Sequence, residues 1–328
     1  MPLAVDSLLN NRYRIKKIIA QGGMGAIYRA HDETLDVEVA VKENLITSQE
    51  SSRQFHREAT ILAGMRHPNM PRVTDHFVIP DQGQYLVMDF ISGEDLRQRI
   101  DRKGPLAESE AVLIITAACD ALTYLHTSQP PIVHRDIKPG NIKVTPDGQV
   151  FLVDFGLAKI SQAGKATTLG AQALTPGYAP PEQYGRGTDS RSDLYSLGAT
   201  LYAALTGKTP EDSLARATGS RRLTPLREYN PNISVSLAAV IEKDMNIDPN
   251  QRYQTAESFK AALLEANTSA RRTLEETRHV RVSPAPPSQP PLTPTVHAAA
   301  GTAAESLAPA PPAPRPAAGA PPACLLYT

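Results

Sequence analysis

Near its middle the sequence reads Val133-His134-Arg135-Asp136-Ile137-Lys138-Pro139-Gly140-Asn141, and Asp154-Phe155-Gly156 begins 13 residues after Asn141. Phosphoryl transfer needs a carboxylate near the incoming hydroxyl, a cation on the transferred group and oxygen ligands for a divalent metal. Asp136 can supply the first and Lys138 the second, while Asn141 and Asp154 can supply the third. The two stretches, in this order, therefore indicate a phosphoryl-transfer site.

A glycine-rich stretch, Gly22-Gly23-Met24-Gly25, lies upstream between two strand-like runs, which places its glycines in a hairpin turn. Such glycines let backbone N–H groups approach phosphate oxygens. Taken alone, the stretch is better interpreted as a structural hairpin. It gains weight from Lys42, which ends a strand-like run, and from Glu58, which could pair with Lys42 and aim its ammonium at phosphates. An ordinary surface ion pair is the alternative for any Lys and Glu.

The pattern around these residues predicts an α+β protein with two lobes. A small antiparallel β lobe with one helix occupies residues 12–90, and a larger, mainly helical lobe occupies residues 91–266. The predicted strands are Tyr13–Ile19, Ala26–Ala30, Glu38–Lys42, Arg72–Val78 and Tyr85–Phe90, and the predicted small-lobe helix is Ser51–Arg66. The large lobe is predicted to hold helices at Glu108–His126, Ser190–Leu205, Ser234–Met245 and Thr255–Ala266, with strand-like pieces near Ile142–Val144 and Phe151–Val153.

The last part of the chain, residues 267–328, differs in composition. Residues 281–328 hold 13 of the 29 prolines, and no period organises them. Few bulky residues are present to offset the entropy of ordering, so we expect a disordered, Pro/Ala-rich linker or tail. A docking site for a proline-binding partner is the less favoured alternative to a simple spacer.

Composition excludes several classes of function. The 328 residues are 41% hydrophobic and carry 34 basic and 34 acidic side chains, which gives no reason to expect nucleic-acid or anionic-membrane binding. Two distant cysteines, Cys119 and Cys324, argue against a disulfide scaffold. Neither a signal peptide nor 18 consecutive apolar residues are found, so no membrane span is expected. These features favour a cytoplasmic protein, membrane-anchored only if the native chain extends beyond residue 328.

From about Tyr13 to Ala266 these motifs resemble those of protein kinases. The Gly-Gly-Met-Gly loop and Asp-Ile-Lys-Pro-Gly-Asn are most similar to bacterial Hanks-type (eukaryotic-like) Ser/Thr protein kinases. The resemblance implies a bilobal protein-kinase-like domain over residues 12–266, with ATP in the cleft between the lobes. It also implies a non-specific serine/threonine protein kinase that acts on protein substrates in bacterial signalling.

The resemblance also assigns roles to individual residues. Asp136 is then the catalytic base, Lys42 binds the α- and β-phosphates while pairing with Glu58, and Asn141 and Asp154 hold Mg²⁺, with Mn²⁺ as the alternative. Lys138 and Thr175 complete the catalytic set. The implied nucleotide-binding residues are Ala20, Gln21, Gly22, Gly23, Met24, Gly25, Ile27, Ala40, Lys42, Met88, Asp89, Phe90 and Lys143.

Similarity assigns the protein to the Ser/Thr rather than the tyrosine branch through Lys138 and the stretch Thr175-Pro176-Gly177-Tyr178. Thr175 is expected to hydrogen-bond Asp136 and Lys138. A buried Glu182–Arg252 pair and Asp193, beneath the catalytic loop, are expected to act as structural supports.

The chain departs from the family's pattern at several positions without losing a catalytic group. Ala20 replaces the first loop glycine, Leu174 and Pro180 replace the usual glycine and alanine nearby, Tyr195 stands where tryptophan is common, and Lys143 replaces an apolar residue. The methylene stem of Lys143 could cover the adenine while its ammonium reaches water.

Two further hypotheses concern regulation and assembly. Thr167 or Thr168 is expected to be phosphorylated in trans by a second copy, and the added charge could order the loop. Similar kinases suggest a homodimer through the small lobe. The alternatives to an active protein kinase are a pseudokinase scaffold, which should lack Lys42, Asp136 or Asp154, and a small-molecule kinase of related fold.

Overall fold

The computed structural model of the chain describes residues 2–23, 25–45, 49–154, 174–185 and 187–281, without the side chains of residues 49–51, 54, 58 and 270–281. Contacts divide the protein into two units, Met1–Val282 and Ser283–Thr328, and everything described belongs to the first. The expected tail from residue 282 onward lies outside the described residues, as do Met24, Thr167 and Thr168.

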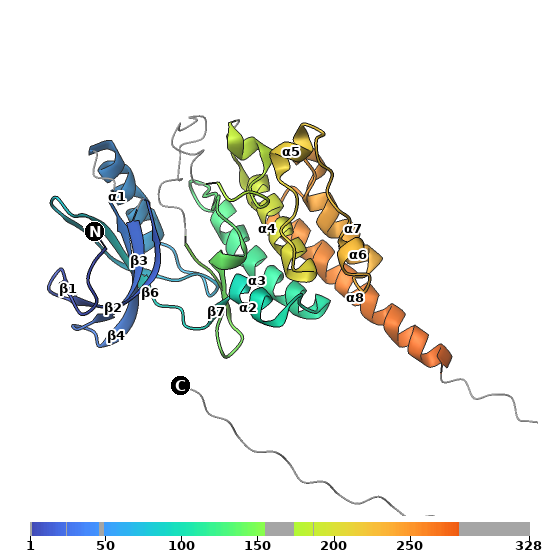
Figure 1. Ribbon diagram of the computed structural model, residues 1–328, viewed down its shortest axis with the longest axis horizontal. Coiled ribbons are helices and arrows are strands. Elements are labelled where there is room, and N and C mark those ends of the chain that lie inside the picture. Colours follow the sequence, from blue (N-terminus) through green and yellow to red (C-terminus); the bar gives the residue numbers. More distant parts are fainter. Residues whose placement is uncertain (1, 24, 46–48, 155–173, 186, 282–328) are drawn as a thin grey trace, which may run out of the picture. The chain divides into compact units, whose positions relative to one another are not determined.

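The small lobe (blue in Figure 1) is a six-stranded antiparallel sheet with one helix. Its strands are ordered β1-β2-β3-β4-β6-β5. The strands are β1 (Leu8–Leu9), β2 (Tyr13–Gly22), β3 (Gly25–Asp32), β4 (Val37–Asn44), β5 (Val73–Ile79) and β6 (Gly83–Asp89), and the helix is α1 (Gln49–Ala63). The five predicted strands and the helix are confirmed, each boundary lying within 3 residues of its predicted place. The two-residue strand β1 was not predicted.

One face of this sheet is apolar because inward and outward side chains alternate along each strand. Val39 and Val41 of β4 point to the same side and join a buried cluster with Tyr13, Tyr28 and Tyr85. The cluster holds the sheet together independently of the large lobe.

Gly25 opens β3 and fits there for a steric reason. It has a φ of +147°, and a Cβ atom at this position would lie 2.0 Å from the backbone oxygen of Glu43 on β4. No side chain can occupy that space. A Cβ atom at Gly22 or Gly23 would meet nothing within 4 Å. Gly25 therefore permits the close approach of two strands, and the other two glycines leave the tip of the turn open.

The large lobe (green to orange in Figure 1) is mainly helical, as predicted, and has a small three-stranded sheet. Its helices are α2 (Leu96–Lys103), α3 (Glu108–His126), α4 (Ser190–Thr206), α5 (Ser213–Ala217), α6 (Leu226–Tyr229), α7 (Val235–Asp244) and α8 (Ala256–Arg281), with 3₁₀ turns η1 (Pro139–Asn141), η3 (Pro181–Tyr184) and η4 (Pro249–Gln251). The three strands, β7 (Glu94–Asp95), β8 (Ile142–Val144) and β9 (Val150–Leu152), are ordered β7-β8-β9. Helix α8, expected to end at Ala266, continues to Arg281. The expectation that the disordered tail begins at residue 267 is therefore wrong for residues 267–281, which are helical.

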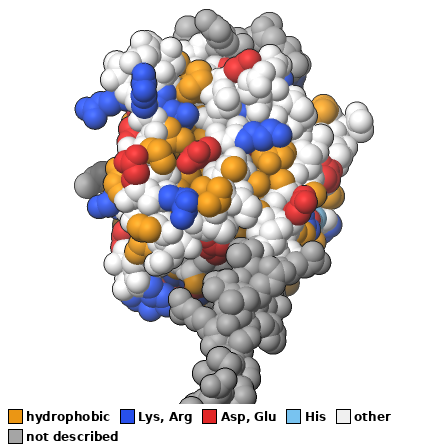
Figure 2. Space-filling view, turned by 90° about the vertical axis from the view of Figure 1, so that its right-hand side faces the viewer, with side chains coloured by type: hydrophobic (Ala, Val, Ile, Leu, Met, Phe, Trp, Pro, Cys, Tyr) orange, Lys and Arg blue, Asp and Glu red, His pale blue; other side chains and the backbone are white. Residues whose placement is uncertain are grey.

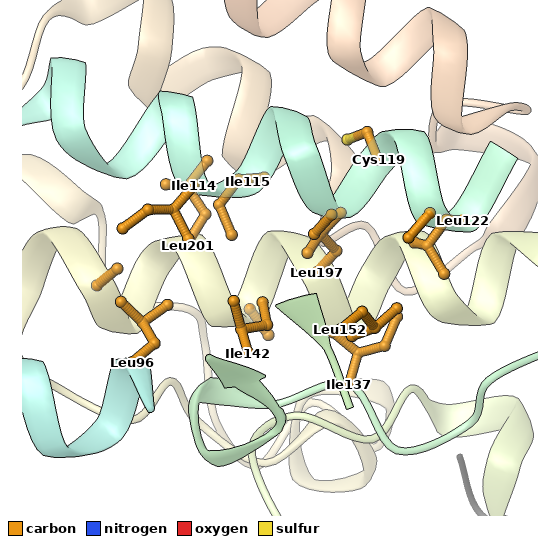
Figure 3. Packing of buried hydrophobic residues seen from close by; sticks show 14 of the residues in the cluster. Leu96, Ile114, Ile115, Cys119, Leu122, Ile137, Ile142, Leu152, Leu197 and Leu201 are labelled. Atoms are coloured by element: carbon orange, nitrogen blue, oxygen red, sulfur yellow. The ribbon is translucent and has the colours of Figure 1, made fainter. Parts of the chain in front are cut away.

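Helix α4 forms the centre of the large-lobe core. Every residue from Ser192 to Thr206 is buried, as expected for a helix surrounded on all sides. Figure 3 shows side chains of α3 and α4 packed together with Ile137 and Ile142, which flank the loop carrying Lys138 and Asn141. Both isoleucines are essentially inaccessible to solvent. Their burial fixes the loop at both ends and leaves the polar residues between and beside them to face the site.

No helix in the described part of the chain combines the length and hydrophobicity needed to cross a membrane. Figure 2 shows one face of the molecule, on which acidic and basic side chains are interspersed with small hydrophobic patches.

Candidate active site

A buried carboxylate holds the backbone just before Asp136. The backbone N–H groups of His134 and Arg135 donate to the two Asp193 carboxylate oxygens, each at 2.8 Å, and His126 Nε2 lies 2.9 Å from Oδ2. Asp193 is wholly inaccessible to solvent. Burial alone would raise the pKa of its carboxyl group, but the hydrogen bond to His126 and the backbone N–H of Arg135 hold that pKa below its usual value. The expected support of the loop by Asp193 is therefore visible as two hydrogen bonds.

The loop itself adopts an uncommon backbone conformation. Arg135 has a φ of +66°, in a region that residues other than glycine rarely adopt. The next backbone N–H, that of Asp136, points to His134 Nδ1 at 3.3 Å, while His134 Nε2 lies 3.3 Å from the Val153 carbonyl oxygen. Burial lowers the pKa of His134, so a neutral ring can accept at one nitrogen and donate at the other.

The polar side chains of this loop converge on the Asp136 carboxylate. Lys138 Nζ lies 3.1 and 3.0 Å from its two oxygens and 3.3 Å from Thr175 Oγ1. Thr175 Oγ1 is 3.5 Å from Asp136 Oδ1, as expected from the sequence. Asn141 Nδ2 donates to the Asp136 carbonyl oxygen at 2.7 Å and to Oδ2 at 3.1 Å. The amide oxygen of Asn141 is therefore the side-chain atom left for a metal.

A second carboxylate enters the site after β9. Asp154 also has a positive φ, +62°, and Lys42 Nζ from β4 donates to its Oδ1. Burial alone would raise the pKa of Asp154, but the charge and hydrogen bond of Lys42 outweigh it and lower that pKa. The contact joins the small lobe to the large one. The Glu58 side chain lies outside the described residues, so its expected pairing with Lys42 is not among these contacts.

The residues expected around the adenine lie along β4, β6 and β8. Ala40 pairs with Met88 in the sheet, and Asp89 exchanges backbone and side-chain hydrogen bonds with Arg72. Lys143 Nζ, which was expected to reach water, donates to the Gly93 carbonyl oxygen at 3.2 Å. Phe90 lies under the Arg29 guanidinium, whose carbon is 4.9 Å from the ring centroid. These contacts fix the chain segment that joins the two lobes.

A buried ion pair lies beneath the Thr175 loop. Arg252 Nη1 and Nη2 donate to the two Glu182 oxygens at 2.7 and 3.0 Å, and the Arg252 side chain is 0% exposed. The Tyr195 ring lies against Arg252, 4.9 Å from the guanidinium carbon, and its hydroxyl accepts a hydrogen bond from Arg216 at 2.9 Å. The pair expected from the sequence is thus present. The hydrogen bond from Arg216 needs the Tyr195 hydroxyl, which the tryptophan common at this position does not have.

Sequence reasoning missed two contacts of this site. His126 bonds Asp193, and Gln183 Nε2 donates to the Arg135 carbonyl oxygen at 2.8 Å. His126 was interpreted only as the end of an apolar helix. Gln183 directly follows Glu182, which the sequence analysis had named as a structural support. That adjacency was the one sequence signal that could have pointed to a role for Gln183.

Comparison with known proteins decides the family. The family model described as "Protein kinase domain" matches residues 13–281. The chain belongs to the protein kinase family. A probable serine/threonine-protein kinase of Clostridium perfringens is 36% identical over 264 residues, which cover 78% of this chain and 38% of that protein. PknB of Mycobacterium leprae is 34% identical over 79% of this chain and 44% of its own length, and PrkC of Bacillus subtilis is 33% identical over 79% and 41%.

Solved structures agree with the protein kinase assignment. The crystal structure of the Mycobacterium tuberculosis PknI kinase domain is 26% identical, covers 81% of this chain and all of that one, and superposes with a TM-score of 0.64. Rad53 in complex with AMP-PNP is 28% identical, with a TM-score of 0.62. The kinase chain described here spans less than half the length of the three relatives named above. Its kinase family uses ATP and a divalent metal ion.

Proposed function

We propose that this protein transfers the γ-phosphoryl group of ATP to serine or threonine hydroxyls of proteins. The observation that carries the proposal is the position of Lys138 Nζ, within 3.3 Å of the Asp136 carboxylate and of Thr175 Oγ1. A lysine there binds the base and the substrate-facing loop at once and keeps a positive charge beside the reaction. The serine/threonine-protein kinases among its relatives support the same assignment.

The reaction follows from these groups. The substrate hydroxyl oxygen forms a bond to the γ-phosphorus, the bond from that phosphorus to the β,γ-bridging oxygen breaks, and ADP leaves. The hydroxyl proton passes to Asp136, whose position is fixed by Lys138 and Asn141. Lys138 stabilises negative charge on the transferred group, and Lys42 does so for the other phosphates.

The metal proposed for this site is Mg²⁺, held by Asn141 and Asp154. Both residues offer oxygen, the ligand atom that Mg²⁺ prefers, and the site needs few protein ligands because substrate phosphates complete the shell. Within the described residues no cluster of three or more His, Cys, Asp or Glu side chains is placed to hold a metal on its own, which fits a site shared with a nucleotide. Bound Mg²⁺ would neutralise charge on the phosphate oxygens.

Two alternatives to an active protein kinase remain less well supported. A pseudokinase scaffold should lack part of the set Lys42, Asp136 and Asp154, and all three are present. A small-molecule kinase has no evident need for the hydrogen bond from Lys138 to Thr175 or for the Glu182–Arg252 ion pair beneath the substrate-facing loop.

We also propose autophosphorylation of Thr167 or Thr168 in trans. Both threonines lie outside the described residues. The proposal is supported by their position in the sequence and by Arg135, the basic residue directly before the proposed base Asp136. Mass spectrometry of active protein should find phosphate on one of them, and an active protein phosphorylated at neither contradicts this part of the proposal.

A homodimer through the small lobe is the assembly we propose. It is supported by two exposed apolar side chains near the β3–β4 turn, Leu35 and Val37, which are 60% and 45% exposed. Sedimentation should show a dimer that Leu35→Asp weakens. A parent that stays monomeric at high concentration contradicts the small-lobe dimer.

Radiolabelled ATP, Mg²⁺ and a generic protein substrate test the activity directly. The purified chain should label serine or threonine in the substrate. Labelling of a small molecule alone would favour the small-molecule alternative, and ATP binding without transfer would favour the scaffold.

A further inference from the structure

The peptide group between Arg135 and Asp136 is held from two sides. Its N–H, which belongs to Asp136, faces His134 Nδ1 at 3.3 Å, and its carbonyl oxygen, which belongs to Arg135, accepts a hydrogen bond from Gln183 Nε2 at 2.8 Å. The second bond is the shorter and comes from a segment 48 residues away. This peptide plane directly sets the direction of the Asp136 side chain.

The backbone at this point needs holding because its conformation is unfavourable. Arg135, at a φ of +66°, lies in the left-handed region, which a side chain disfavours. Asp193 fixes the preceding side of Arg135 by accepting its N–H at 2.8 Å, and Gln183 fixes the following side through the carbonyl. With either bond lost, the peptide before Asp136 could rotate toward a more common conformation.

Gln183 is held rigidly enough to fix the position of the Arg135 carbonyl group. It belongs to η3, between Glu182, which is bound by Arg252 and Ser192, and Tyr184, whose hydroxyl donates to Asp212 at 2.9 Å. The same short segment follows the loop that carries Thr175. Its 3₁₀ turn is therefore fixed on both sides of Gln183, so the amide group meets the Arg135 carbonyl oxygen from a rigid position.

We propose that Gln183 is a positioning residue for phosphoryl transfer: its amide orients the peptide that carries Asp136 and links the substrate-facing loop to the base. Gln183 does not touch the reacting atoms and acts through Arg135. This role rests on the proposed kinase activity. It predicts an effect on the chemical step and none on ATP binding, because no described contact of the Gln183 side chain reaches Lys42, Asn141 or Asp154.

The test compares variants of similar size in the full chain. Gln183→Met removes the hydrogen bond and should lower kcat about 5- to 10-fold, the size expected for one partly buried hydrogen bond. Gln183→Glu places a carboxylate oxygen against the carbonyl and should lower kcat further. KM for ATP and the melting temperature should stay close to those of the parent for both variants.

Gln254→Met is the matched control. Gln254 Nε2 also donates to a backbone carbonyl oxygen, that of Arg252, at 2.8 Å, but it lies away from the base. The control should keep the parent kcat.

The outcomes separate this role from the proposed function. A parent that transfers no phosphate overturns both. An active parent whose kcat survives Gln183→Met and Gln183→Glu within twofold overturns the positioning role alone. So does a loss of kcat that merely follows melting temperature across all three variants. A fall in kcat in the order Gln, Met, Glu at constant KM and melting temperature supports it.

Discussion

Asp244, the last residue of α7, carries a carboxyl group in an unusual environment. It is fully buried, and among the described residues neither carboxylate oxygen has a hydrogen bond of good geometry, the backbone N–H of Tyr253 being the nearby donor. The Gly198 backbone of α4 packs close to this carboxyl group, because a Cβ atom added there would lie only 3.1 Å from Asp244 Oδ2. Burial raises the pKa of Asp244 from 3.8 to about 8, although the charges of Arg252 and Lys243 act against it.

The raised pKa has a consequence for stability. The folded protein keeps Asp244 protonated near neutral pH, whereas the unfolded chain releases the proton above about pH 3.8. Stability from this group is thus fully present below pH 3.8 and is lost as pH rises toward 8. At 1.36 kcal/mol for each pH unit, the parent should lose about 3 kcal/mol more than Asp244→Asn between pH 5.5 and pH 8.

Urea denaturation at several pH values measures this difference. Asp244→Asn has nearly the same shape and cannot titrate, so its free energy of unfolding should depend less steeply on pH. The two proteins should differ most near pH 8, where the variant should be the more stable. Parallel pH dependences for parent and variant would refute the reasoning, because they would mean that Asp244 ionises alike in the folded and unfolded chain.

Three further predictions concern the site and its supports. Gly25→Ala should lower the melting temperature, because the added Cβ would overlap the β4 backbone, whereas Gly23→Ala should not; equal melting curves would contradict the packing argument. Arg252→Ala leaves the nearly buried Glu182 carboxylate without its cationic partner and should cost about 3–5 kcal/mol in urea denaturation. A loss under 1 kcal/mol would mean that water reaches the pair. Asp193→Asn should lower kcat about 100-fold with little change in KM for ATP, since it weakens the hold on the backbone before the base. An unchanged kcat in steady-state assays would show that the loop holds its shape without this carboxylate.

Strong local patterns made the fold predictable. The strands of the small lobe alternate in burial, and the long helix at Glu108–His126 is almost continuously apolar, so both appear where the sequence indicates them. Strand β1 has only two residues, too few for a pattern. The extension of α8 beyond Ala266 was missed because the apolar spacing that signalled the helix ends there.

The site residues could be predicted where particular residue types, at a fixed spacing along the chain, are typical of a known chemistry. The triplet of Asp136, Lys138 and Asn141 is of this kind. Gln183 is not, because a side chain that bonds a backbone carbonyl 48 residues away leaves no periodic trace. Asp244 lies seven residues after Leu237, on the buried face of its helix, so the spacing could have flagged a buried acid.

The most direct test of the central claim pairs the full chain with Asp136→Asn. Both proteins are incubated with ATP, Mg²⁺ and a protein substrate, and phosphate is mapped by mass spectrometry. We predict phosphoserine or phosphothreonine with the parent and a loss of about 1,000-fold or more with the variant, at unchanged ATP binding. Equal transfer by both proteins, or none by a parent that binds ATP, would contradict the account.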